Sequence, residues 1–101
     1  MKRKEYNGWT NYETWVTKLW MDNNQESYNY YQELAEEYRK QPYELSQRIK
    51  EEFEEANPLN ELESSVFHDL LNSAMSNINW YEIAESLLED LPELEEEEED
   101  E

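Results

Sequence analysis

The chain has 101 residues, of which 37% are hydrophobic, and a formal net charge of −19. This length allows a single domain, and the negative charge disfavours contact with nucleic acids and anionic membranes. The lack of cysteine excludes disulfides, thiolate metal sites and a cysteine nucleophile. No apolar run reaches the roughly 18 residues of a membrane span, so we expect a soluble, cytoplasmic protein.

The first helix is predicted to follow Thr10, which forms a capping-box pattern with Glu13. Apolar residues then recur at spacings of three and four, which place them on one helical face. This face consists of Tyr12, Trp15, Val16, Leu19 and Trp20. Asn23 offers a cap for a second helix, which should end near Gln41 because Pro42 disfavours helical geometry in the preceding residue. The apolar stripe of that helix is Tyr28, Tyr31, Leu34, Ala35 and Tyr38.

Three further helices are predicted in the rest of the chain. Pro42 suits the first turn of the third helix, and Asn57-Pro58 predicts the start of the fourth. Asn79 is expected to cap the last helix, and Pro92 to end it. The apolar stripes are Leu45, Ile49, Phe53 and Ala56; then Leu59, Leu62, Val66 and Leu70, with Phe67 and Leu71 beside them; then Trp80, Ile83, Ala84, Leu87, Leu88 and Leu91.

These patterns predict an all-α fold, a compact bundle of about five short amphipathic helices around one core. We expect a flexible N-terminal arm at residues 1–8 and a single helical domain at 9–92. Residues 93–101 should form a disordered acidic tail, because their charges repel one another and bury nothing. Core packing is the expected role of Trp9 and Trp15, although an interface built partly from Trp9, Trp15 and Trp20 stays open.

Residues suited to catalysis are scarce. His68 is the single histidine, and its neighbour Asp69 cannot face it from an adjacent helical position. No serine lies in a recognisable nucleophile turn, and Gly8 is the single glycine, which excludes a glycine-rich phosphate loop. We therefore expect no enzymatic activity, no metal and no cofactor.

Two segments carry a resemblance to a known family. The sequence NGWTNYETW at 7–15 and the sequence INWYEIAE at 78–85 resemble the opening and closing segments of a family of small phage, plasmid and prophage proteins. The function of that family is uncharacterised, so the resemblance implies no catalytic or binding residues. It implies a mobile-element context, in which small acidic proteins often antagonise host nucleic-acid enzymes.

The excess negative charge lies entirely in the second half of the chain. Residues 1–50 hold eight acids and eight bases, whereas residues 51–101 hold nineteen acids and no Lys or Arg. Rows of carboxylates on packed helices can approach the charge density of duplex DNA, which is about one charge per 1.7 Å of axis. The candidate partner-binding residues are therefore Glu51, Glu52, Glu54, Glu55, Glu82, Glu85 and Glu89.

Three functions fit these observations. The first is an inhibitor that mimics the charge of nucleic acid and occupies the basic cleft of a host nucleic-acid-binding protein, such as a restriction or CRISPR effector. The alternative is a small helical adaptor with an aromatic surface, formed by the Trp9–Trp20 region with Tyr28, Tyr30 and Tyr31, in which the acidity serves solubility only. A third is a nucleic-acid binder that uses Lys2, Arg3, Lys4 and the aromatic residues. The sequence specifies neither the partner nor the oligomeric state.

Overall fold

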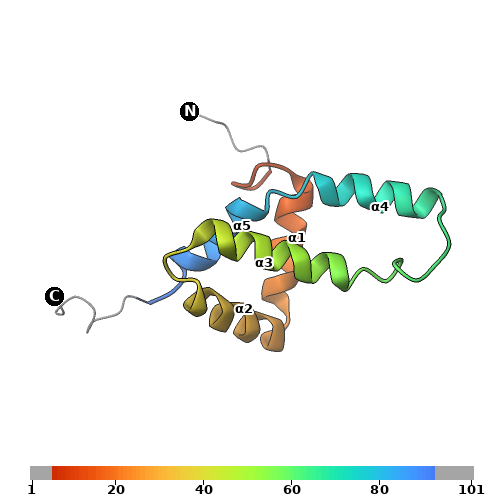
Figure 1. Cartoon of the computed structure of the whole chain (residues 1–101). Coiled ribbons are helices and arrows are strands. Elements are labelled where there is room, and N and C mark those ends of the chain that lie inside the picture. The colour runs from red at the N-terminus through yellow and green to blue at the C-terminus, as the bar shows by residue number, and fades with distance from the viewer. Residues whose placement is uncertain (1–5, 93–101) are drawn as a thin grey trace.

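The computed structural model describes residues 6–92, and these residues contain five α-helices (Figure 1). The helices are α1 (Tyr12–Asn23), α2 (Gln25–Glu37), α3 (Pro42–Glu55), α4 (Val66–Ser76) and α5 (Trp80–Glu89). The predicted all-α fold class is thereby confirmed. The predicted acidic tail at 93–101 and the first five residues of the predicted arm lie outside the described residues.

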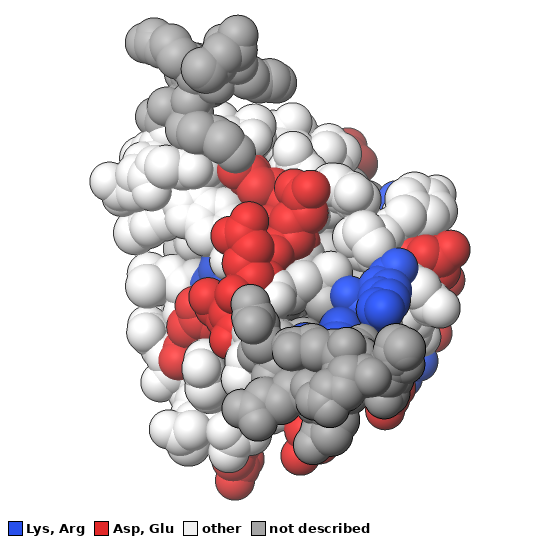
Figure 2. All heavy atoms as spheres, turned by 90° about the vertical axis from the view of Figure 1, so that its left-hand side faces the viewer, with Lys and Arg blue, Asp and Glu red and all other residues white. Residues whose placement is uncertain are grey.

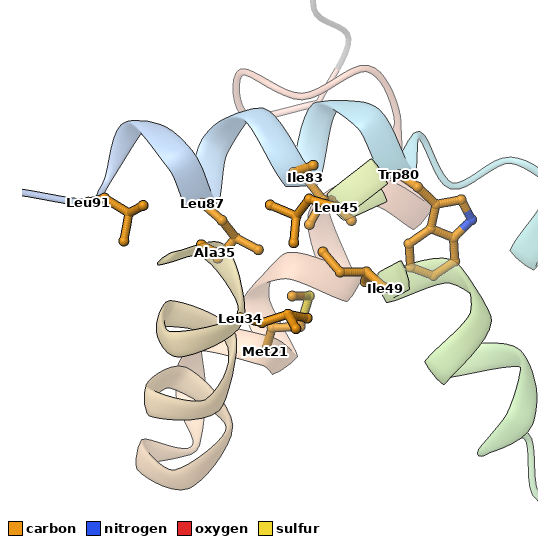
Figure 3. Packing of buried hydrophobic residues seen from close by; sticks show 10 residues of the cluster. Met21, Leu34, Ala35, Leu45, Ile49, Trp80, Ile83, Leu87 and Leu91 are labelled. Carbon is orange, nitrogen blue, oxygen red and sulfur yellow. The ribbon is translucent and has the colours of Figure 1, made fainter. Parts of the chain in front are cut away.

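The hydrophobic core forms where α5 packs against α3, with α2 and α1 completing it (Figure 3). Leu45 and Ile49 of α3 and Ile83 of α5 are fully buried. Phe53, near the end of α3, contacts Trp80 at the start of α5, with ring centroids 5.2 Å apart. Full burial of an aliphatic side chain such as Leu45, Ile49 or Ile83 contributes about 1.5–3 kcal/mol. The packing of α5 against α3 is therefore the main source of stability in the described fold.

Helix α1 turns a different face inward from the one predicted. Its buried residues are Thr14, Lys18 and Met21. The predicted apolar face lies partly outside, because Tyr12 is 50% and Trp20 72% exposed. The buried Lys18 ammonium donates to Asp22 at 2.7 Å, which compensates its charge within the helix.

The orientation of α1 is explained by a set of hydrogen bonds between residues 10–14 and residues 77–82, here called the polar junction. The buried Thr14 hydroxyl accepts a hydrogen bond from the Asn79 backbone N–H at 2.8 Å and donates to Asn11 Oδ1 at 2.6 Å. The Asn11 amide donates to the Asn77 carbonyl at 2.7 Å, and the Thr10 N–H donates to Glu82 Oε1 at 3.1 Å. These bonds place the segment before α1 beside the segment that opens α5. The side chain of Asn11 also caps α1, so the predicted Thr10 cap is wrong.

The other helix starts were predicted with mixed success. Helix α3 begins at Pro42 and α5 is capped by Asn79, as predicted, whereas α2 is capped by Asn24 and not by Asn23. The fourth helix was predicted to begin after Asn57-Pro58, and this is wrong. Asn57 Oδ1 instead accepts from the Leu59 N–H at 2.8 Å, which closes a turn, and α4 starts only after its cap, Ser65.

Helix α4 stands apart from the bundle (Figure 1), so the expectation that all five helices share one core is wrong for α4. It contains no buried residue. Val66, Phe67 and Leu70 are each more than 60% exposed, and only Met75 near its C-terminal end packs against the core. An apolar stripe is therefore present on α4 as predicted, but half of it faces solvent.

Helices α2 and α3 are joined by an aromatic contact and a carboxylate. Tyr31 stacks on Phe53 with ring centroids 6.5 Å apart. Beside them, Glu52 Oε2 accepts hydrogen bonds from the Tyr30 hydroxyl at 2.5 Å and from Arg48 Nε at 2.8 Å. Burial, together with the negative charge of Glu52, raises the pKa of Tyr31 to about 12.

Replacing Thr14 tests the polar junction. Thr14→Val keeps the shape of the side chain but leaves the Asn79 N–H without its acceptor. The free energy of unfolding, measured with urea, should fall by about 1–3 kcal/mol. Thr17→Val is the matched control, because the Thr17 hydroxyl donates to the Glu13 carbonyl within the same helix. Equal losses in the two variants would contradict a special role for the junction.

The shifted pKa of Tyr31 predicts an alkaline loss of stability. A folded-state pKa above the ordinary value of 10.0 means that the contribution of the neutral ring is fully present below pH 10 and is lost as the pH rises to about 12. The free energy of unfolding should fall over this interval, and Tyr31→Phe should flatten that fall. An unchanged slope in the variant would show that Tyr31 does not carry the effect.

Candidate functional site

Three of the seven predicted contact residues come together on α5. Glu82, Glu85 and Glu89 line one open groove of about 300 Å³, here called the α5 groove. Their spacings of three and four residues place them on one side of the helix, while Ile83 and Leu87 on the other side are buried in the core. The hydrophobic packing of α5 therefore directs this row of carboxylates outward.

The opposite wall of the α5 groove comes from the start of the described chain. Residues 6–9 form a tight turn, in which Tyr6 and Trp9 exchange two backbone hydrogen bonds of 2.8 and 2.7 Å. Gly8 takes a φ of 90° in this turn, a conformation that favours glycine. The turn brings Gly8 and Trp9 into the groove lining beside Ser86. Gly8, predicted as part of the flexible arm at residues 1–8, thus lines the site.

The carboxylates of the row differ in their surroundings. Glu82 is half-buried and accepts the backbone hydrogen bond from Thr10 at 3.1 Å, so its position is fixed by the polar junction. Glu85 and Glu89 are exposed. The groove therefore combines one positioned carboxylate with two that can adjust to a partner.

The four predicted contact residues of α3 do not join this row. They lie at the end of α3 that contacts Trp80, the first residue of α5, whereas the row extends to Glu89 at the other end of α5. Glu52 is already paired with Arg48 and bonded to Tyr30. Glu54 lines a separate cleft together with Lys50, while Glu51 and Glu55 are exposed. The structure thus divides the seven candidates into two groups.

Figure 2 shows the side of the molecule on which α5 ends. Acidic side chains form a band across this face, and the Lys and Arg side chains visible there lie mostly to one side of it. The formal net charge of −19 reinforces the local field of such a band. This face is suited to a positively charged surface.

The chemistry of the α5 groove favours cationic side chains. A helical rise of about 1.5 Å per residue spreads the three carboxylates over about 10 Å. Arginine can donate two parallel hydrogen bonds to one carboxylate. Trp9 lies in the same lining, and tryptophan is the residue that forms the strongest cation–π contacts. Two or three Lys or Arg side chains of a partner match these dimensions.

His68 has a local structural role. Its Nε2 lies 2.7 Å from the Leu59 carbonyl oxygen and its Nδ1 lies 3.3 Å from the Ser65 hydroxyl. The ring therefore links the loop before α4 to the helix itself. Within residues 6–92, no three His, Cys, Asp or Glu residues are arranged to hold a metal ion, and none of the helices there is long and apolar enough to span a membrane.

The aromatic residues of the alternative interface differ in their surroundings. Trp9 and Tyr31 pack against the core, and Trp15 contacts the Tyr6 ring at a centroid distance of 4.9 Å. Tyr30 is 42% exposed, but its hydroxyl is bonded to Glu52. Trp20, at 72% exposure, is the aromatic side chain of this set that is most open to solvent. Trp9, Trp15 and Tyr31 thus make packing contacts within the described chain, whereas Trp20 and Tyr30 keep exposed ring surface.

Sequence reasoning missed the wall of the α5 groove that the turn at residues 6–9 provides. The single glycine directly before Trp9 was the available signal, because a glycine at that point permits a turn with positive φ. Sequence reasoning also missed a second groove, which is apolar and lies beside α4. The periodicity of apolar residues does not show whether a helical face is covered by other elements.

Comparisons with known proteins give a family but no function. No curated protein and no solved structure matches this chain. A model of a family of unknown function, DUF7249, matches residues 2–101. Because this match covers nearly the whole sequence, the chain belongs to the DUF7249 family.

Proposed function

We propose that this protein is a non-enzymatic binding protein whose α5 groove engages a basic surface of another protein. The observation that carries the proposal is the gathering of Glu82, Glu85 and Glu89 in one groove, on a helix whose opposite side forms the core. Such a row needs no catalytic chemistry to act, because occupying a Lys- or Arg-lined surface is enough to block it.

The support for this proposal is both structural and electrostatic. The burial of α5 and the hydrogen bond from Thr10 to Glu82 hold part of the row in place before binding, which reduces the entropy lost on association. The overall charge of −19 adds long-range attraction for basic partners and should accelerate their encounter.

The most specific form of the proposal is mimicry of nucleic-acid charge. The resemblance to phage and plasmid proteins supports a role in mobile elements, whose targets would include host proteins with phosphate-binding clefts, such as restriction or CRISPR effectors. The carboxylates are spaced about 5 Å apart along the axis, against about 3.4 Å for the phosphates of one DNA strand. The row would therefore replace a few phosphates and not a long duplex.

A second candidate is an adaptor that binds through apolar contacts. The exposure of Trp20, at 72%, favours it, because large aromatic side chains are frequent anchors of interfaces. In that case Trp20→Ala should abolish binding to a partner, and reversal of charges on α5 should matter little.

Removing two carboxylates from the row tests the main proposal. The double variant Glu85→Gln/Glu89→Gln should weaken the binding of a fluorescent arginine-rich peptide by about tenfold, which corresponds to about 1.4 kcal/mol. Glu82 is kept because its carboxylate also holds the Thr10 N–H. Fluorescence anisotropy at low ionic strength measures the affinity.

The matched control is Glu51→Gln/Glu55→Gln, which removes the same charge from two exposed positions on α3. It should change the affinity by less than about twofold, because exposed charges away from the contact contribute little. Equal weakening in both double variants would assign the binding to overall charge and contradict the role of the groove.

A further inference from the structure

Helix α4 and an apolar groove beside it form a surface that the bundle leaves uncovered. The groove has a volume of about 510 Å³ and is here called the α4 groove. Val16 and Thr17 of α1 form one wall, and Leu71, Ala74 and Met75 of α4 form the other. Ligand sites in proteins commonly occupy about 300–1,000 Å³, so the α4 groove can accept more than one apolar side chain.

The exposed tip of α4 continues the apolar surface of this groove. Val66, Phe67 and Leu70 are 61%, 67% and 63% exposed. Their spacing from Leu71 and Ala74 places them on the same helical stripe. One end of the stripe therefore lines the α4 groove, and the other projects from the molecule, as Figure 1 shows for the helix as a whole.

The charge distribution indicates what covers this surface. Residues 64–79 contain one acid, Asp69, and no Lys or Arg, in a chain with a net charge of −19. The α4 groove likewise has one charged residue in its lining, Glu13. A basic partner would need acids within the apolar surface, whereas Glu61 and Glu63, the next acids along the chain, lie in the loop before α4. A second copy of the chain needs a surface where few carboxylates face one another, and α4 provides it.

We propose that α4 mediates a two-fold symmetric dimer, in which the tip of α4 from each copy enters the α4 groove of the other. Val66, Phe67 and Leu70 of one copy would then contact Leu71, Ala74 and Met75 of its partner, with the two helices antiparallel. Such an interface is reciprocal, as closed two-fold symmetry requires, because each copy supplies one tip and one groove.

Area and helix length support a dimer of this kind. Covering the exposed parts of Val66, Phe67 and Leu70 removes on the order of 300 Å² of apolar surface per copy. The groove lining adds to this area, and stable interfaces bury about 800 Å² per partner. Helix α4 has 11 residues and no buried side chain. Isolated helices of that length are marginal in water, so pairing would supply the packing that α4 lacks.

Sedimentation equilibrium over a range of protein concentrations tests the proposal on the full chain. The chain should dimerise, and Phe67→Glu should weaken dimerisation by at least about tenfold. Thr17→Glu, which introduces a charge on the opposite wall of the α4 groove, should weaken it similarly. Trp20→Glu is the matched control, because it adds the same charge at a side chain that is 72% exposed on α1 and is absent from the groove lining.

Several results would overturn the proposal. These are a chain that stays monomeric at every concentration, a Trp20→Glu variant as weakened as Phe67→Glu, or a dimer that Thr17→Glu does not affect. The test is independent of the proposed function, because raising the ionic strength from about 0.1 to 1 M shortens the Debye length from about 10 to 3 Å. That change should strengthen a dimer of acidic chains, whereas it should weaken binding to an arginine-rich peptide.

Discussion

The packing of α5 against α3 determines the position of the candidate site. Ile83, Ala84 and Leu87 are almost completely removed from solvent by this contact and by α2 and α1. Because the side chains of one helix point in fixed directions, burying this stripe leaves Glu85 and Glu89 on the outside. The same interaction that stabilises the fold therefore builds the acidic row, and a loss of core packing would also disperse the row.

The polar junction connects two segments that lie far apart in the sequence, residues 10–14 and residues 77–82. Asn11 and Thr14 in the first segment bond to Asn77 and Asn79 at the start of the second, across more than sixty residues of sequence. These hydrogen bonds join the two ends of the described domain. Two bonds extend from the junction to the α5 groove: the Thr10 N–H donates to Glu82 Oε1, and the Glu82 N–H donates to Asn79 Oδ1.

Much of the fold could be predicted from the sequence, because periodicity, Pro42 and Asn79 mark helices that the structure contains. The orientation of α1 could not, since nothing in its periodicity shows that the Thr14 hydroxyl is needed inside. The isolation of α4 could not be predicted either, because an apolar stripe has the same pattern whether it is packed or exposed.

The candidate site, like the fold, could be predicted from the sequence only in part. The spacing of Glu82, Glu85 and Glu89 along one helix was sufficient to place them together. The glutamates of α3 were grouped with them because the second half of the chain holds nineteen acids and no Lys or Arg. Their separation depends on how two helices run past each other, and this is decided by long-range packing such as the contact between Phe53 and Trp80.

The two proposed surfaces are distinct in chemistry: the α5 groove is acidic and lies on the bundle, and the α4 groove is apolar and lies beside the projecting helix. The central claim concerns the first of them. Titrating an unlabelled arginine-rich peptide into the isotopically labelled chain, and following the backbone amide signals by NMR, tests it directly. The largest shifts should fall on Gly8, Trp9 and residues 82–89. Shifts that centre on residues 51–55, or that spread evenly over the bundle, would contradict it.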